Sequence, residues 1–195
     1  MKKKLLLLVA LMICSTFVVS GTIAYYTDQD TAHNVITSSG VHIDIEEWQV
    51  SGEDWVPYPK DAPIAVMPAT TVSKIVTVRN KEAKAYIRAQ FTVTVKDADD
   101  QVMELDQTTL ESIISIVPNS EYWMTGQVDD GWYYYKDTVG TDKVTEPLFS
   151  EVVFSGVNMT NEYQNCTIEI DVDAQAVQAA NNGSSVLEAA GWPAE

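Results

Sequence analysis

The stretch that decides the fold reads AYIRAQFTVTVK and covers residues 85–96. Apolar and polar residues alternate along it, so one face carries Ala85, Ile87, Ala89, Phe91, Val93 and Val95. The opposite face carries Tyr86, Arg88, Gln90, Thr92, Thr94 and Lys96. Because successive side chains of a strand point to opposite faces, the pattern predicts a long antiparallel strand with one face on a core.

Other segments repeat this signature at shorter length. Residues 41–46 (VHIDIE) and 166–173 (CTIEIDVD) alternate in the same way, and β-branched or aromatic residues fill 72–78, 132–135 and 148–154. Residues 80–84 predict a hairpin-type loop, residues 97–100 close the long strand, and residues 129–131 predict a tight turn. The four prolines in 57–68 predict an extended crossover loop.

One helix is expected among the strands. Thr108 and Glu111 have the spacing of a capping box, and apolar residues follow at helical spacing before a proline: Leu110, Ile113, Ile114 and Val117. Residues 174–180 and 184–190 predict short helical turns. The prediction is an all-β fold, an antiparallel jelly-roll or Greek-key β-sandwich with one short amphipathic helix, forming a single domain over residues 25–195.

The N-terminus has the pattern of a secretory signal peptide over residues 1–24. Three lysines precede a nearly unbroken apolar run, and small residues at Thr22 and Ala24 predict cleavage before Tyr25. The alternative is an uncleaved membrane anchor, because the apolar run almost reaches spanning length. We therefore expect the protein to be secreted, in the extracellular matrix or at the cell surface.

Charge and cysteine content narrow the possible functions. Loss of the leader removes three of the 12 basic residues, which leaves 9 against 28 acidic residues and a net charge of −19. Such a surface repels nucleic acid, so nucleic-acid binding is not expected. Cys14 lies in the leader, and Cys166 then stands alone and can form no internal disulfide. We interpret Cys166 as a buried small apolar residue, with a reactive thiol as the alternative.

The sequence contains no recognisable catalytic motif. Its two histidines, His33 and His42, lack the spacing of helical zinc sites, and no nucleophile elbow or phosphate loop is present. His42 shares a strand face with Asp44 and Glu46, which is either a metal site or a solvated polar face. Calcium is the one cofactor considered, and a solvated acidic turn is the alternative; the acids concerned are Asp97, Asp99, Asp100 and Glu104. We expect the protein not to be an enzyme and to need no cofactor.

Aromatic residues are densest around Tyr122-Trp123 and at 132–135 (WYYY). Alternate rings of a strand point to opposite faces, so part of the cluster is expected in the core. The alternative is a ligand surface, which would stack on sugars or act as an adhesin through Trp123, Trp132 and Tyr133 to Tyr135.

An ordered series of motifs resembles the TasA/camelysin family of Gram-positive bacteria. The series starts with Gly21 to Asp28 around the cleavage point and continues through Val41 to Trp48. It goes on through Lys74 to Asn80, Ala85 to Arg88, Gly131 to Lys136, Ala174 to Ala179 and Trp192. The resemblance covers most of the chain. It implies a jelly-roll-like sandwich, export by a SipW-type signal peptidase and assembly into biofilm-matrix fibres, with an accessory matrix protein as a possible partner. Some members are instead described as casein-cleaving metallopeptidases.

We hypothesise a route of self-assembly into a homopolymer. The mature N-terminus, Tyr25 to about Ile36, would add as a strand to the sheet of the next copy, a contact that propagates because it does not close. The expected anchors are Tyr25, Tyr26, Val35 and Ile36. The alternative is that this segment pairs within its own domain as a first strand. A metallopeptidase using His33 or His42, and a surface adhesin or carbohydrate-binding module, are the other functions considered.

Overall fold

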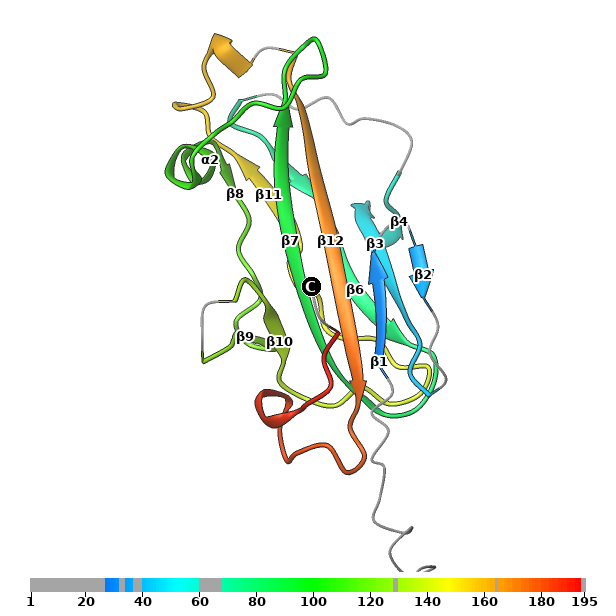
Figure 1. The fold of residues 1–195 in the computed structure, drawn as a ribbon. Helices are drawn as coiled ribbons and strands as arrows, with labels where there is room; N and C mark the ends of the chain where they lie inside the picture. The colour runs from blue at the N-terminus through cyan, green and yellow to red at the C-terminus, as the bar shows by residue number, and fades with distance from the viewer. Residues whose placement is uncertain are drawn as a thin grey trace, which may run out of the picture.

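The long strand predicted from alternation lies at the centre of a six-stranded antiparallel sheet (Figure 1). The structure is a computed structural model that describes residues 27–31, 34–36, 40–59, 68–127, 130–163 and 165–193, the first two ranges by their backbone alone. β7 (Ala85–Lys96) has the predicted bounds and pairs over all twelve residues with β12 (Thr167–Gln178). The order is β2-β1-β12-β7-β10-β9, in which the other members are β1 (Thr27–Thr31), β2 (Asn34–Ile36), β9 (Trp123–Thr125) and β10 (Tyr133–Tyr135).

The second layer consists of two three-stranded antiparallel sheets. One has the order β4-β3-β6 and contains β3 (Ile43–Ser51), β4 (Asp54–Pro57) and β6 (Ile75–Asn80). The other has the order β5-β11-β8 and contains β5 (Thr71–Ser73), β8 (Ile114–Ser115) and β11 (Glu151–Phe154). Lys74 separates β5 from β6, and its amide donates to the Ser150 carbonyl at 3.1 Å. The expected 72–78 strand is therefore present but interrupted at Lys74.

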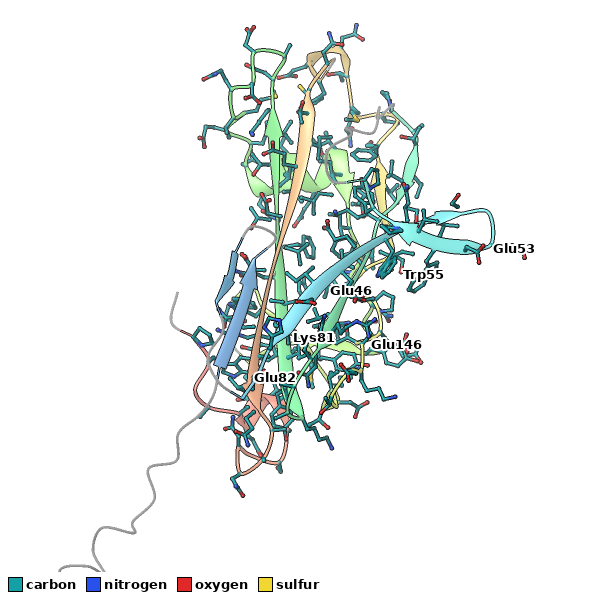
Figure 2. The ribbon with its side chains drawn as sticks, turned by 90° about the vertical axis from the view of Figure 1, so that its right-hand side faces the viewer. Glu46, Glu53, Trp55, Lys81, Glu82 and Glu146 are labelled. Carbon is teal, nitrogen blue, oxygen red and sulfur yellow. The ribbon has the colours of Figure 1, made fainter. Side chains whose placement is uncertain are left out.

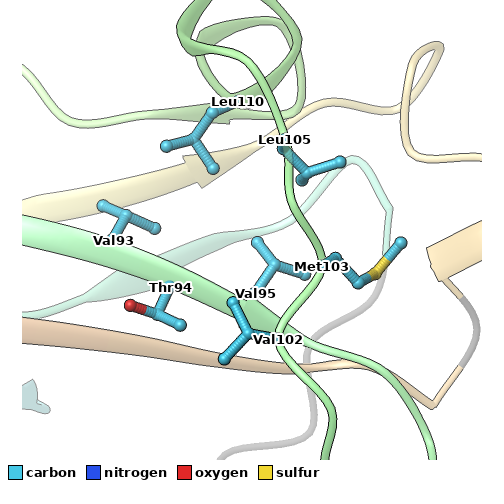
Figure 3. Close-up of a pocket in the computed structure, with 7 residues that line it drawn as sticks. All are labelled: Val93, Thr94, Val95, Val102, Met103, Leu105 and Leu110. Carbon is cyan, nitrogen blue, oxygen red and sulfur yellow. The ribbon is translucent and has the colours of Figure 1, made fainter.

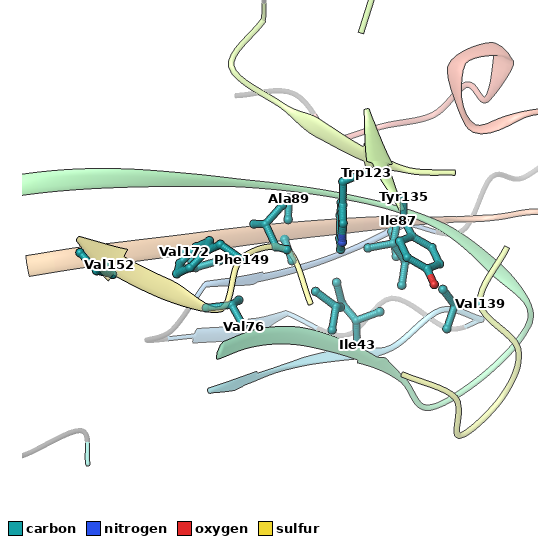
Figure 4. Close-up of a cluster of buried hydrophobic side chains, with 14 of the residues drawn as sticks. Ile43, Val76, Ile87, Ala89, Trp123, Tyr135, Val139, Phe149, Val152 and Val172 are labelled. Carbon is teal, nitrogen blue, oxygen red and sulfur yellow. The ribbon is translucent and has the colours of Figure 1, made fainter. Parts of the chain in front are cut away.

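The main core fills the space between the two layers (Figure 4). Ile87 and Val172 project from the six-stranded sheet, and Ile43, Val76 and Phe149 meet them from the other side, all at most 2% exposed. Burial of apolar area at about 25 cal/mol per Å² is the main force that holds the layers together. The fold is therefore an all-β sandwich, as the alternation predicted.

A second, smaller core covers the outer face of the six-stranded sheet. The C-terminal segment folds back over β7 and β10, with Val186 fully buried and Trp192 packed against the cluster. It covers Tyr86 and Arg88, which are only 6% and 8% exposed although alternation placed them on the polar face. This end of β7 is therefore buried on both faces.

The helix differs in its ends from the expectation. α2 spans Gln107–Ile113, and Asp106 rather than Thr108 is its N-cap, because the Asp106 carboxylate accepts from the Thr109 amide at 2.8 Å. Ile114 begins β8, and Val117 is 73% exposed, so neither continues the apolar stripe of the helix. Within the described residues, no helix has the length and apolar character needed to cross a membrane.

Two other expectations, for the loop at 80–84 and for the helical turn at 174–180, were wrong. Residues 80–84 do not close a hairpin, because β6 pairs with β3 while β7 pairs with β12, so this loop crosses between the layers. Residues 174–178 belong to β12 rather than to a helical turn, since their pairing with β7 satisfies the backbone. In the 184–190 region a single 3-10 turn forms, at Val186–Glu188. A further 3-10 turn occupies Asn161–Tyr163.

Candidate functional site

The N-terminal strand β1 lies between β12 and β2 in the six-stranded sheet and covers one edge of β12. β1 pairs antiparallel with β12 from Thr27↔Val177 to Thr31↔Asp173, and β2 pairs with β1 on its outer side. All five residues of β1 (TDQDT) are polar, whereas Ala174 and Ala176 of β12 are fully buried. Main-chain hydrogen bonds are therefore the main attraction that this strand can offer to β12.

This pairing is the alternative to strand donation considered above, formed within one chain. Val35 and Ile36 lie in β2, as register partners of Asp30 and Gln29. The expected cleavage residues Thr22, Ala24 and Tyr25, and the expected anchor Tyr26, lie outside the described residues, as does His33.

The polar face around His42 is occupied by ion pairs. His42 Nε2 lies 3.5 Å from Asp44 Oδ1, and Asp44 also pairs with Lys81. Glu46 receives two donors from Arg79, of which Nη2 lies at 3.2 Å. The bond to Asp44 raises the pKa of Lys81 above its ordinary value. These carboxylates are therefore engaged by cations of the chain itself.

The acidic turn after β7 is held by its own backbone. Asp97 Oδ1 accepts from the amides of Asp99 and Gln101, each at 2.9 Å, and Asp100 Oδ1 lies 3.9 Å from Lys96 Nζ. Asp97 therefore acts as the capping residue of this turn. Across the described ranges, no three His, Cys, Asp or Glu side chains gather in a way that would hold a metal ion.

The aromatic cluster is mostly interior. Trp123 and Trp132 are each 2% exposed, and Tyr134 and Tyr135 are nearly as buried. Tyr133 is partly buried and stacks on Phe91, with ring centroids 5.8 Å apart. The residues proposed for sugar stacking therefore serve mainly as core.

Sequence reasoning missed the role of Arg88 within this cluster. Its guanidinium carbon lies 4.2 Å from the Trp132 ring centroid and 4.9 Å from that of Trp192. Its Nε and Nη2 donate to Gln175 Oε1 at 3.0 and 2.7 Å, and its Nη1 donates to Tyr134 OH. Arg88 thus joins the C-terminal segment to the sheet. Its two tryptophan partners are far from it in the sequence, so no local pattern signalled this role.

Sequence reasoning also missed the hairpin that β3 and β4 form. Figure 2 shows it projecting from the body, with Glu53 near its tip. The cross-strand partners Val50 and Trp55 are each 52% exposed. At its base, Lys74 Nζ lies 2.6 Å from Glu47 Oε1 and 4.2 Å from the Tyr58 ring centroid. Burial, together with the Glu47 charge, raises the pKa of Tyr58. The Ser-Gly-Glu turn between two tryptophan-containing runs was the available signal.

Cys166 lies just before β12 and is partly buried against the main core. Its Sγ lies 3.6 Å from Met103 Sδ. Burial, followed by the charges of Asp97 and Glu162, raises the pKa of the thiol and so favours its unreactive protonated form. This agrees with the interpretation of Cys166 as a small apolar residue.

No protein-family model, curated protein or solved structure matches this chain. The resemblance to the TasA/camelysin family therefore stays a prediction from the sequence motifs.

Proposed function

We propose that this chain is a secreted structural subunit that assembles head-to-tail into extracellular fibres. In the proposed contact, the segment 25–36 of one copy pairs with β12 of the next copy. The supporting observation is that β1, an entirely polar strand, covers the edge of β12 whose alternate residues lie in the core.

The same ladder can form within a chain or between chains. A main-chain ladder carries no information about which copy supplies the strand, so β1 of a second copy can use the register Thr27↔Val177 to Thr31↔Asp173. Within one chain the pairing is closed, whereas between chains it leaves one donor and one acceptor free and therefore propagates. Cleavage after Ala24 would release the donor end from the membrane and act as the switch.

Nothing in this assembly requires catalysis, and we propose a non-enzymatic role. The high negative charge would keep the exported subunit soluble until pairing occurs. The motifs shared with the TasA/camelysin family favour a matrix fibre and a SipW-type signal peptidase as the processing partner.

A mixed cross-linking experiment tests the contact. One preparation of residues 25–195 carries Thr31→Cys and another carries Asp173→Cys, both with Cys166→Ser to remove the native thiol. These positions are register partners, and partners on adjacent strands lie about 5 Å apart, within disulfide range. Each chain then carries one cysteine, so oxidation of the mixture should give disulfide-linked dimers on non-reducing gels, while electron microscopy should show filaments.

The matched control replaces Asp173→Cys with Asp171→Cys, two residues out of register, and should cross-link far less. A version lacking residues 25–34 should fold and stay monomeric. Filaments from that deletion would contradict the proposal. So would a mixture that stays monomeric while a chain with both cysteines closes its own disulfide, because β1 would then be an ordinary first strand.

A further inference from the structure

The six-stranded sheet has a second edge that no described strand covers. On the side away from β12, β10 pairs with β7 only at Arg88 and Ala89, and the next contact is the bridge Lys96↔Val102. Among the described residues, Gln90 to Thr94 have no strand partner on that side. The gap between Ala89 and Val95 is about 20 Å long at the usual rise per residue.

The backbone at this gap faces outward. The Met103 amide donates to the Val95 carbonyl at 2.8 Å, so the backbone groups of Val95 point toward the open side. Because these groups alternate with a period of two, those of Val93 and Phe91 point to the same side. Two amide donors and two carbonyl acceptors therefore line the edge.

A pocket of about 90 Å³, lined mostly by residues with aliphatic side chains, adjoins this edge (Figure 3). Its lining includes Val93 and Thr94, which are neighbours in the strand and so belong to opposite faces of β7; the pocket therefore wraps around the strand edge. The other side is formed by Met103 and Leu105, which precede α2, and by Leu110 of α2. An engineered cavity of about 150 Å³ holds benzene, so this volume suits one small aliphatic side chain.

The segment that forms the rim of the pocket is strongly acidic. Residues 97–111 contain six carboxylates and no lysine, arginine or histidine. The nearest cation in sequence, Lys96, is already paired with Glu169 at 2.7 Å. Glu104 and Glu111 are exposed, and in the sequence they flank the segment that holds the pocket residue Leu105. A ligand at this edge thus meets main-chain donors and acceptors, an aliphatic hollow and negative charge.

We infer that the open edge of β7 and its pocket bind an extended segment of a partner protein in which aliphatic residues alternate and lysine or arginine residues flank them. The segment adds as a strand, accepts from the amides of Phe91 and Val93, and donates to their carbonyls. One aliphatic side chain fills the pocket, and the flanking cations meet the acidic rim. The N-terminal segment of a second copy is a poor occupant, because residues 25–36 contain Asp28 and Asp30 and no lysine or arginine. The inference is independent of fibre assembly, which uses the edge of β12.

A designed peptide tests the inference on the chain of residues 25–195. The probe is an acetylated and amidated peptide of alternating valine and threonine with a lysine at each end, followed by fluorescence polarisation. Amide hydrogen exchange by NMR should show slower exchange at Phe91 and Val93 and no change along β12. A peptide N-methylated at every valine and every threonine, which cannot donate to the ladder from either edge, should not bind. A peptide with terminal glutamates should bind at least tenfold more weakly.

Two variants test the contributions of the pocket and of the acidic rim to binding separately. Leu105→Trp fills the pocket and should weaken binding at least tenfold, whereas Leu187→Trp, the same change at an exposed site in the C-terminal turn, should leave binding unchanged. Glu104→Lys should weaken binding of the lysine peptide several-fold without touching the core. Absence of binding at about 1 mM peptide would overturn the inference. Equal binding of the N-methylated peptide would also overturn the inference. The same holds if the amides of Phe91 and Val93 exchange more slowly when protein concentration alone is raised, because a second copy would then be the occupant.

Discussion

The Lys74–Glu47 pair at the base of the projecting hairpin allows a quantitative test of the fold. The two side chains are only 7% and 10% exposed, and Nζ lies 2.6 Å from Oε1. Glu47→Gln leaves the ammonium buried with an uncharged partner. Removing one member of a buried pair costs about 3–5 kcal/mol, because the other charge loses both water and its counter-charge.

The Tyr58 ring should reduce the loss of stability in Glu47→Gln, the single variant that keeps Lys74. With Lys74 Nζ 4.2 Å from the ring centroid, a cation–π contact retains about 1 kcal/mol. We therefore expect Glu47→Gln to cost about 2–4 kcal/mol and Lys74→Met, which leaves the carboxylate without its partner, about 3–5 kcal/mol. The double variant Lys74→Met and Glu47→Leu should lie within about 1 kcal/mol of the wild type, because well-packed apolar side chains replace the pair.

Urea and thermal unfolding of the four proteins measure these differences in free energy of unfolding. In a domain of this size each kcal/mol moves Tm by about 2–4 °C, so the single variants should be clearly resolved. Lys81→Met removes a more exposed pair, with side chains 39% and 33% exposed, and should leave Tm nearly unchanged. A double variant as unstable as the worse single variant would refute the reasoning, since the charge penalty would then not be the cause.

Three further changes test the core, the C-terminal turn and the helix cap. Leu148→Ala removes a fully buried side chain and should lower the free energy of unfolding by about 2–5 kcal/mol, whereas the exposed Val50→Ala should leave the urea midpoint unchanged. Gly183→Ala should speed hydrogen exchange of residues 184–190, because φ is 78° and a Cβ would lie 3.0 Å from Glu188; Gly52→Ala, with φ of 68° but open space, should not affect that region. The Thr109 amide lowers the pKa of Asp106 below 3.8, so the cap stabilises α2 above that value and is lost as pH falls through the folded pKa. Asp106→Ala should therefore speed exchange of residues 107–113 at neutral pH but not below the folded pKa, and an unchanged rate at neutral pH would contradict the cap.

The part of the fold that follows from local alternation was predictable. β7 has the predicted bounds, and Cys166 packs against the core at the start of β12, because a period of two is a property of the strand itself. Helix and loop ends were less predictable. Asp106 rather than Thr108 supplies the cap, through a local bond from the Thr109 amide. The loop at 80–84 crosses between layers because β6 and β7 pair with strands distant in sequence.

The candidate sites divide in the same way. Acidic residues near His42 and after β7 suggested metal ligands, but Lys81, Arg79 and backbone amides engage them in the folded chain. The sequence contains these cationic and backbone partners, but it does not show that they lie next to the carboxylates. The open edge of β7 was equally invisible, since it depends on where β10 stops pairing.

By itself the sequence determined an antiparallel all-β chain with a leader-like N-terminus and an excess of acid, because alternation, composition and the order of short motifs are local properties. Only the tertiary structure decided that Tyr86 and Arg88 are buried, that Lys74 and Glu47 meet across 27 residues, and that one edge of β7 is left without a described strand. The physical reason is that burial and pairing depend on which distant segments come together. Here the C-terminal segment folds back over a strand face that alternation alone would have left in water.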